Sequence, residues 1–293
     1  CDQFTSQADY WDAVEKHVAD APSTLNVVFP EIYLGTIENQ DNDCKSSGDG
    51  VKNDKETGRK TKYASMTDDE RIKYINTTMD TYLTDGTLKQ AVADGYVLVE
   101  RTTESGVRLG IVGLIDLDDY DFDPKKKTLI RATEGTVISR IPPRVKIREN
   151  AAIELPHVML LVDDPIDRQK IDGCQGATQE DAVNIAAVKH GIIEYVYAIR
   201  DTLRKLYDTD LMQGGGHIRG YAVEGEAARQ VTEAFAAKQN SCGGFLFAVG
   251  DGNHSLATAK TCWENIKKSG KFTEEQLKTH PARHALVEIC NLH

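Results

Sequence analysis

A tight polar turn between two apolar segments is the part of this sequence best suited to chemistry. Residues 245–260 read FLFAVGDGNHSLATAK, so an apolar, strand-like run enters a polar turn and leaves it as a helical pattern. A strand that enters a glycine turn and opens a helix aims several amides and the positive end of the helix dipole at one point. Such a point suits a phosphate group. The groups expected to hold that phosphate are Gly250, Gly252, Asn253, His254 and Ser255.

Two residues of this turn are also candidates for catalysis, namely Asp251 and His254. The Asp251 carboxylate could hold Mg²⁺ or accept a proton from a hydroxyl. The turn fits neither the dinucleotide-binding nor the P-loop glycine pattern, so those templates do not identify its ligand. A structural alternative stays open, in which Asp251 and Gly252 only form the turn and Ser255 caps the helix.

A second candidate segment, residues 131–148, carries five cations and one acid in a chain that is otherwise acidic. Pro142 and Pro143 should break any helix there. If the residues after them are extended, alternate cations share one face that could bind phosphate or carboxylate oxygens. Glu134, in a polar Thr-Glu-Gly-Thr run, is a candidate general base. A solvated charged face is the alternative. The candidate phosphate contacts are Arg131, Thr136, Arg144 and Arg148.

Two further polar segments are weaker candidates. Three glycines precede a histidine at 214–217, where Gly215, Gly216 and His217 could cradle a phosphate, or the glycines could simply follow a helix end. Residues 116–123 hold five acids in eight positions. This segment lacks the Gly and the distal Glu of a calcium loop, so a solvated acidic loop is favoured over a metal site.

Composition excludes several classes of function. The 293 residues carry a formal charge of −11, which disfavours nucleic acid and anionic membranes as partners. No apolar run is long enough to span a bilayer and no signal-peptide pattern is present, so we expect a cytoplasmic protein. The six cysteines form no Cys-x-x-Cys pair and the eight histidines no His-x-x-x-His pair, so a zinc site has no support.

The candidate residues must be positioned by strands and helices, whose patterns are interspersed along the chain. This arrangement predicts an α+β fold, with helices flanking a mixed sheet in a single domain over 1–293. Strand patterns occur at 26–34, 96–101, 107–117, 157–162, 217–223 and 245–249. A capping-box spacing at Thr67 and Glu70 begins one helix, and a long helix is expected over 192–206. Residues 38–62 are almost free of apolar side chains, which predicts a mobile polar insertion.

Four segments together resemble the domain-of-unknown-function family 1015: residues 1–7, 130–150, 214–220 and 250–259. In that family the last motif usually reads Asp-Gly-His-His-Arg. This sequence keeps Asp251, Gly252 and His254, but has Asn253 and Ser255 where the first His and the Arg stand. The Arg contact must then come from elsewhere or be absent. Family members also begin earlier and continue further, so we expect this chain to be a fragment.

The family motif is in turn similar to the phosphate-binding turn of the ParB and sulfiredoxin superfamily, which includes nucleotide-dependent free-serine kinases. This resemblance implies a nucleotide site at the strand-to-helix turn and phosphoryl transfer involving a small hydroxylated metabolite, with serine or phosphoserine as the first substrate to test. ATP or ADP and Mg²⁺ are the implied cofactors. Arg131, Arg144 and Arg148 would then offset charge on the transferred group.

Two other functions stay open at this point. One is a nucleotide-binding regulatory module without turnover, which the missing His and Arg favour. The other is a phosphatase that uses water as the acceptor of the phosphoryl group. The sequence does not predict an oligomeric state.

Overall fold

The computed structural model describes Phe4 and residues 7–33, 62–63, 65–155, 158–165, 191–212 and 214–293. The chain divides into two compact units, which are described separately: Cys1–Lys89 with Val137–Glu154 (unit 1), and Gln90–Thr136 with Leu155–His293 (unit 2). Apart from Lys62, the insertion predicted at 38–62 lies outside the described residues. Across the described ranges, no helix combines the length and apolarity needed to cross a membrane.

Unit 1 is helical, with α1 (Ala8–Val18), α3 (Asp68–Thr84) and α4 (Ile141–Arg148). The capping box is confirmed, because the Thr67 hydroxyl accepts from the Glu70 amide and the Glu70 carboxylate accepts from the Thr67 amide. The strand predicted at 26–34 is wrong. Residues Thr24–Val27 and Glu31–Tyr33 form short 3-10 helices, the first capped by Ser23. Their apolar side chains pack with Trp11 into a small core.

Helix α4 replaces the extended segment predicted after the two prolines. Pro142 and Pro143 lie in its first turn, where backbone N–H groups have no helical partner and a fixed φ favours the helix. In a helix, residues two apart lie about 200° apart around the axis. Lys146 therefore does not share a face with Arg144 and Arg148, as the extended interpretation required.

Unit 2 is built on a mixed sheet, as predicted, with nine strands in the described residues and the order β3-β4-β8-β5-β9-β2-β1-β7-β6. The neighbours from β9 to β6 are antiparallel, whereas β3, β4 and β8 are parallel to one another. Strand β5 is antiparallel to β8 and parallel to β9. The bounds are β1 (Gly95–Thr103), β2 (Gly106–Asp116), β3 (Tyr120–Asp121), β4 (Ile130–Ala132), β5 (Val158–Val162), β6 (Arg204–Asp210), β7 (His217–Glu224), β8 (Phe247–Asp251) and β9 (His284–Asn291).

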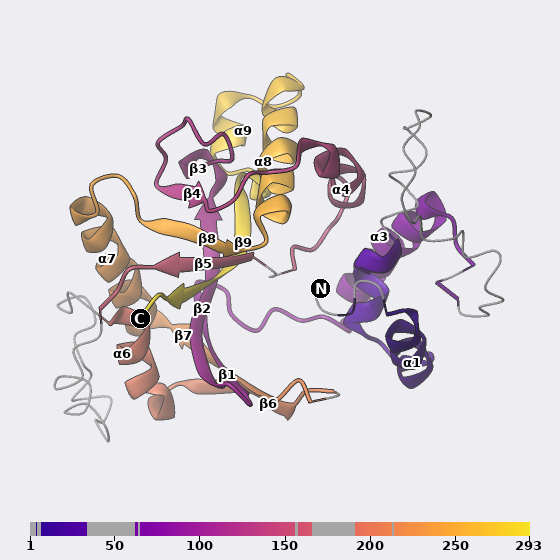
Figure 1. Ribbon diagram of the computed structural model, residues 1–293, viewed down its shortest axis with the longest axis horizontal. Helices are drawn as coiled ribbons and strands as arrows, with labels where there is room; N and C mark the ends of the chain where they lie inside the picture. The colour runs from indigo at the N-terminus through magenta and orange to yellow at the C-terminus, as the bar shows by residue number, and fades with distance from the viewer. Residues whose placement is uncertain are drawn as a thin grey trace. The chain divides into compact units, whose positions relative to one another are not determined.

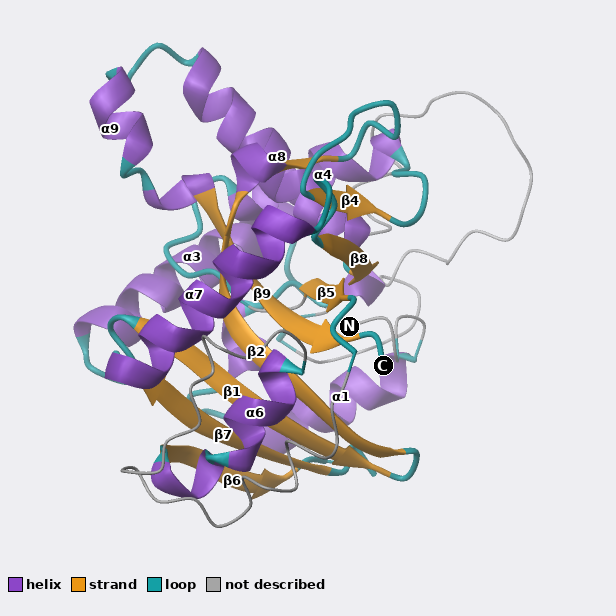
Figure 2. Cartoon of the chain, turned by 90° about the vertical axis from the view of Figure 1, so that its left-hand side faces the viewer, coloured by secondary structure: helices purple, strands orange, loops and turns teal. Residues whose placement is uncertain are grey.

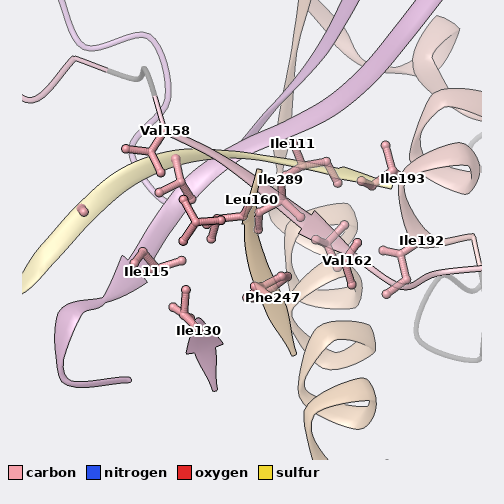
Figure 3. Close-up of a cluster of buried hydrophobic side chains, with 14 of the residues drawn as sticks. Ile111, Ile115, Ile130, Val158, Leu160, Val162, Ile192, Ile193, Phe247 and Ile289 are labelled. Atoms are coloured by element: carbon pink, nitrogen blue, oxygen red, sulfur yellow. The ribbon is translucent and has the colours of Figure 1, made fainter. Parts of the chain in front are cut away.

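Helices α6 (Ile192–Ala198) and α7 (Gly225–Ser241) cover one side of this sheet, in front of the strands in Figure 2. Helix α8 (Asn253–Lys268) begins where β8 ends, and α9 (Glu274–Lys278) follows it (Figure 1). Alternate residues of β5, namely Val158, Leu160 and Val162, are buried in the core (Figure 3). Ile192 and Ile193 of α6 pack against the same core.

The long helix predicted over 192–206 is wrong in its second half. Helix α6 ends at Ala198, and Arg204–Asp210 form the edge strand β6. The helical spacing of Leu203 and Leu206 is overridden because β6 pairs with the next strand, β7, in a hairpin that supplies its backbone hydrogen bonds.

Candidate functional site

The polar turn joins β8 to α8, as predicted. Gly252 occupies the helix cap position with φ +86°, a left-handed conformation that favours glycine. Gly250 has no positive φ and is needed for a different reason. A Cβ atom there would lie 2.9 Å from Cγ of Leu161, so the missing side chain makes room for β5.

The start of α8 has no side-chain cap. The cap residue is Gly252, so Ser255 lies within the first turn and does not cap the helix. The first intrahelical bond is donated by the Leu256 amide to the Gly252 carbonyl oxygen at 2.9 Å. The amides before Leu256 therefore lie at the positive end of a 16-residue helix.

The parallel strands β4 and β8 bring a second segment to this turn, because their carboxyl ends lie at the same edge of the sheet. The Thr133 hydroxyl donates to the Val249 carbonyl oxygen at 2.6 Å. Asn253 Nδ2 donates to Glu134 Oε1 at 3.3 Å. Ligands of open α/β sheets bind outside the carboxyl ends of such strands. We call residues 133–136 and 251–255 the strand-end site.

Two carboxylates belong to the strand-end site, Asp251 and Glu134. They stand at the ends of adjacent strands, whose spacing is about 4.8 Å. Asp251 Oδ1 accepts from the Gly252 amide at 2.7 Å. The described residues contain no group of three or more acidic, His or Cys side chains able to hold a metal. Mg²⁺ is usually held by one or two carboxylates together with substrate phosphates and water, so the donor chemistry of either residue suits this ion.

Asn253 is the most deeply buried residue of the strand-end site, with 3% of its surface exposed. A carboxylate only accepts hydrogen bonds, so the amide NH₂ of Asn253 must face Glu134 and Oδ1 must face away. Oδ1 has no hydrogen-bond partner, and neither has the buried hydroxyl of Thr136. An unmet buried polar group costs about 1–3 kcal/mol, and such groups in native proteins often mark functional sites.

Arg131, in β4, does not reach this turn. Its guanidinium donates from Nε to the Thr128 carbonyl oxygen at 2.9 Å and from a terminal nitrogen to the Gly244 carbonyl oxygen at 3.1 Å. It also stacks on the Phe245 ring, 4.5 Å from the centroid. Gly244 and Phe245 precede β8, whereas the turn follows it, so the guanidinium lies toward the opposite end of the strand.

Two other predicted cations, Arg144 and Arg148, belong to α4 of unit 1. Arg144 donates to the Arg140 carbonyl oxygen at 2.9 Å. Arg148 forms an ion pair with Glu154 at 2.6 Å. The charge of Arg148 is therefore already balanced within unit 1.

The glycine-rich segment before His217 is also separate from the turn. It connects β6 and β7, and β7 lies five strand positions from β8, which corresponds to roughly 24 Å. Gly215 accepts two hydrogen bonds from Arg101. Gly216 has φ +81°, and a Cβ there would meet the Thr102 carbonyl oxygen. The role of these glycines is thus explained by the hairpin itself.

His217 lies between two carboxylates of the edge strand β6. Its Nδ1 is 2.6 Å from Asp210 Oδ1 and its Nε2 is 2.6 Å from Asp208 Oδ1. The hydrogen bonds with Asp210 and Asp208 raise the pKa of His217 above its ordinary value. The histidine therefore fastens β6 to β7.

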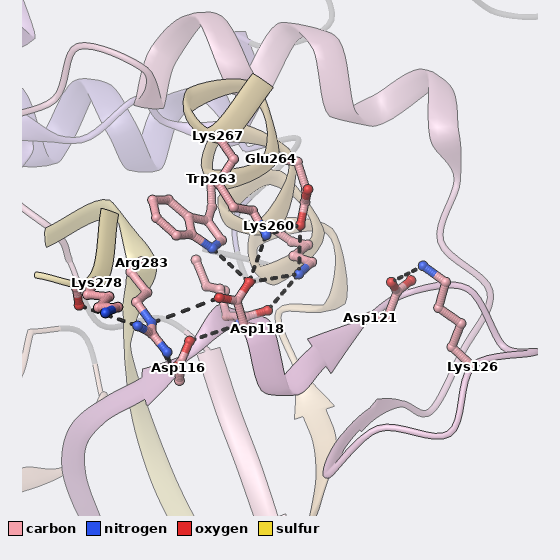
Figure 4. Close-up of polar contacts among 11 residues, drawn as sticks. Asp116, Asp118, Asp121, Lys126, Lys260, Trp263, Glu264, Lys267, Lys278 and Arg283 are labelled. Carbon is pink, nitrogen blue, oxygen red and sulfur yellow. Dashed lines mark hydrogen bonds and ion pairs between the residues drawn. The ribbon is translucent and has the colours of Figure 1, made fainter. Parts of the chain in front are cut away.

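The acidic segment at 116–123 is held by ion pairs, not only by solvent, as Figure 4 shows. Asp116 pairs with Arg283 at 2.6 Å. Asp118 accepts from Nε1 of Trp263 at 2.9 Å and from Lys267 at 2.8 Å. Burial tends to raise the pKa of Asp118, but the hydrogen bonds from Lys267 and Trp263 hold it below its usual value. The contacts of Asp118 anchor the second half of α8.

Two residues, one in the strand-end site and one that anchors α8, make contacts that the local sequence does not predict. Thr133 bonds to a carbonyl 116 residues away, and Asp118 bonds to a side chain 145 residues away. The sheet order brings Thr133 to Val249, and the packing of α8 on the segment between β2 and β3 brings Trp263 to Asp118.

Comparison with known proteins identifies one family. The family model described as "Protein of unknown function (DUF1015)" matches residues 56–293, which include every residue of the strand-end site. No curated protein and no solved structure matches the chain.

Proposed function

The chain belongs to the DUF1015 family, and from that premise we propose that the strand-end site binds the phosphates of ATP or ADP and transfers a phosphoryl group to or from a small hydroxylated metabolite. The observation that supports this proposal best is the start of α8. It has no side-chain cap and lies at the carboxyl ends of parallel strands, beside Glu134. Amides at such a helix start bind anions without a further cation.

The first-turn amides of α8, Ser255 and the two carboxylates of the strand-end site then each have a role. Phosphate oxygens would accept from the first-turn amides of α8 and from the Ser255 hydroxyl. Asp251 would hold Mg²⁺, which supplies positive charge against the phosphates, and Glu134 would stay free of the metal. The carboxylate that is not occupied by the metal would take the proton of the acceptor hydroxyl. As that proton leaves, the new O–P bond forms and the bond to the nucleotide's leaving oxygen breaks.

Serine and phosphoserine are the first substrates to test, because both are small and carry the oxygen that gains or loses the phosphoryl group. A location in the cytoplasm, where ATP and ADP are abundant, is part of the proposal. So is the expectation that neither nucleic acid nor a membrane is a partner.

A second function, nucleotide binding without turnover, is favoured by one specific observation. The Arg131 guanidinium is engaged by Thr128, Gly244 and Phe245 at the other end of the strand, so it does not stand over the transferred group. A regulatory module needs the phosphate-binding amides but not this cation.

The test is ³¹P NMR of the pure protein with ATP or ADP, Mg²⁺, and serine or phosphoserine. We expect product with the wild type, and a loss of about 10²- to 10⁴-fold in turnover for Glu134→Gln, as for a general base. Asp251→Asn should lose activity as well. Glu104→Gln, which changes an exposed acid in the β1–β2 turn, is the matched control and should retain it.

The other outcomes select between the alternatives. Nucleotide binding by calorimetry with no product over a panel of metabolites would support the regulatory module. Phosphate release from phosphoserine without nucleotide would support a phosphatase. Absence of nucleotide binding would refute both nucleotide-dependent functions.

A further inference from the structure

A separate cavity of about 240 Å³ lies in unit 2 on the side of the sheet that carries α7. Its walls include Leu129 and Ile130 at the start of β4, and Leu246 and Phe247 at the start of β8. The strand-end site lies beyond the opposite ends of these two strands. The cavity and the strand-end site are therefore distinct.

The interior of this cavity is mainly apolar. Phe235 and Ala236 of α7 face β4 and β8 across it, and Ile289 of β9 contributes to the wall. At the rim, the Tyr96 hydroxyl and the Thr232 hydroxyl lie 2.7 Å apart and link β1 to α7. A mainly apolar hollow with a few polar groups at its edge is the usual form of a small-molecule site.

One polar group at the edge distinguishes the kind of ligand. Asp116 and Asp119 both line the cavity, but Asp116 is paired with Arg283. Nearby Asp118 is balanced by Lys267 and Lys260. Among the residues that the structure describes, Asp119 makes no ion pair or side-chain hydrogen bond. Burial, followed by repulsion from Asp116 and Asp118, raises its pKa above the ordinary value, while the more weakly acting Arg283 and Lys260 lower it.

We propose that this cavity binds a small amphipathic cation, with the apolar body between α7 and the sheet and the ammonium group on the Asp119 carboxylate. The cation would balance the charge of the Asp119 carboxylate, which is exposed at the edge of the cavity. A cavity of about 240 Å³ has room for one aromatic ring with a short amine-bearing chain, such as a phenylethylamine.

The probe is 2-phenylethylammonium, compared at pH 7 with the neutral 2-phenylethanol and the anionic phenylacetate by ligand-observed NMR and calorimetry. We expect affinity to fall in that order. Asp119→Asn should weaken binding of the ammonium compound by roughly three- to tenfold, as expected for a partly exposed charge pair, and leave binding of the alcohol unchanged. Asp123→Asn removes an acid of the same segment that does not line the cavity, and should change neither.

A second pair of variants tests the place of binding. Ala236→Phe should fill the cavity and abolish binding of all probes, whereas Ala237→Phe, one position along α7 and not in the wall, should leave it intact. Thermal unfolding checks that both variants fold. The proposal is overturned if the alcohol binds as well as the ammonium compound, if Asp119→Asn has no effect, or if no probe binds at millimolar concentration.

Discussion

Replacing Asp118 by alanine should destabilise unit 2, because this carboxylate fixes α8 to the segment between β2 and β3. Trp263, whose Nε1 donates to Asp118, has 1% of its surface exposed. The variant leaves that N–H buried without an acceptor, which costs about 1–3 kcal/mol. Loss of the ion pair with Lys267 adds at most about 1 kcal/mol, since both side chains are about a third exposed. We expect a loss of about 2–3 kcal/mol in the free energy of unfolding.

Asp118→Asn separates these two contributions. The asparagine oxygen can still accept from Trp263, so only the charge is lost and the cost should be about 1 kcal/mol or less. Asp123→Ala is the matched control, because the Asp123 carboxylate accepts only from the nearby Lys125 amide among described residues. It should cost less than about 1 kcal/mol.

Urea unfolding followed by tryptophan fluorescence measures these differences. The chain has two tryptophans, so a Trp11→Phe background leaves Trp263 as the reporter of unit 2. If Asp118→Ala costs less than about 0.5 kcal/mol, or no more than Asp118→Asn, the anchoring role is wrong.

The same variants predict a dependence on pH. Because the folded pKa of Asp118 is lowered, its charge stabilises the fold above the unfolded value of about 3.9. That contribution is lost as the pH falls through the lower, folded pKa. The stability difference between wild type and Asp118→Asn should therefore be constant near neutrality and shrink below about pH 4. A difference that grows in acid would contradict this account.

Three further predictions concern single residues. Gly252→Ala places a side chain at φ +86°, so it should cost about 1–2 kcal/mol in urea unfolding and weaken nucleotide binding by calorimetry; an unchanged stability would contradict the left-handed turn. Thr67→Ala should cost about 1 kcal/mol in the unfolding of α3 by circular dichroism, whereas Thr77→Ala in its exposed middle should not. The raised pKa of His217 means that its charged contacts with β6 stabilise this strand fully below about pH 6.5, and that this stabilisation is lost as the pH rises through the folded pKa. Hydrogen exchange of the β6 amides, corrected for the intrinsic rate, should therefore become faster over that range. The His217→Asn variant should not show this pH dependence.

Local sequence patterns correctly predicted those parts of the fold whose hydrogen bonds join residues close together in the sequence. The capping box at Thr67 and the turn at Gly252 are confirmed, because the residues that make their hydrogen bonds lie within a few positions of each other. Pro142 shows the limit of this approach. A proline breaks a helix in its interior but begins one in its first turn, and the two cases differ only in where the helix starts.

The placement of the site residues depends on contacts that no local pattern contains. Glu134 lies beside the turn, as the sequence suggested, because β4 pairs with β8. Arg131, three residues earlier, faces the other end of β8, where Phe245 and Gly244 hold its guanidinium 113 residues away in sequence. The number of cations in the 131–148 segment did not predict where the Arg131 guanidinium lies, since charge composition does not say toward which end of a strand a side chain points.

The position of β9 has a consequence for how the protein is made. This strand, His284–Asn291, lies between β5 and β2, yet the ribosome synthesises it after every other strand that the structure describes. Until it emerges, the four strands that include β8 and the four that include β1 each present an unpaired edge, which invites association with other chains. A nascent chain that already contains the whole β8–α8 turn would thus still lack the strand that joins the two groups of strands, and both edges would stay exposed until synthesis reaches β9.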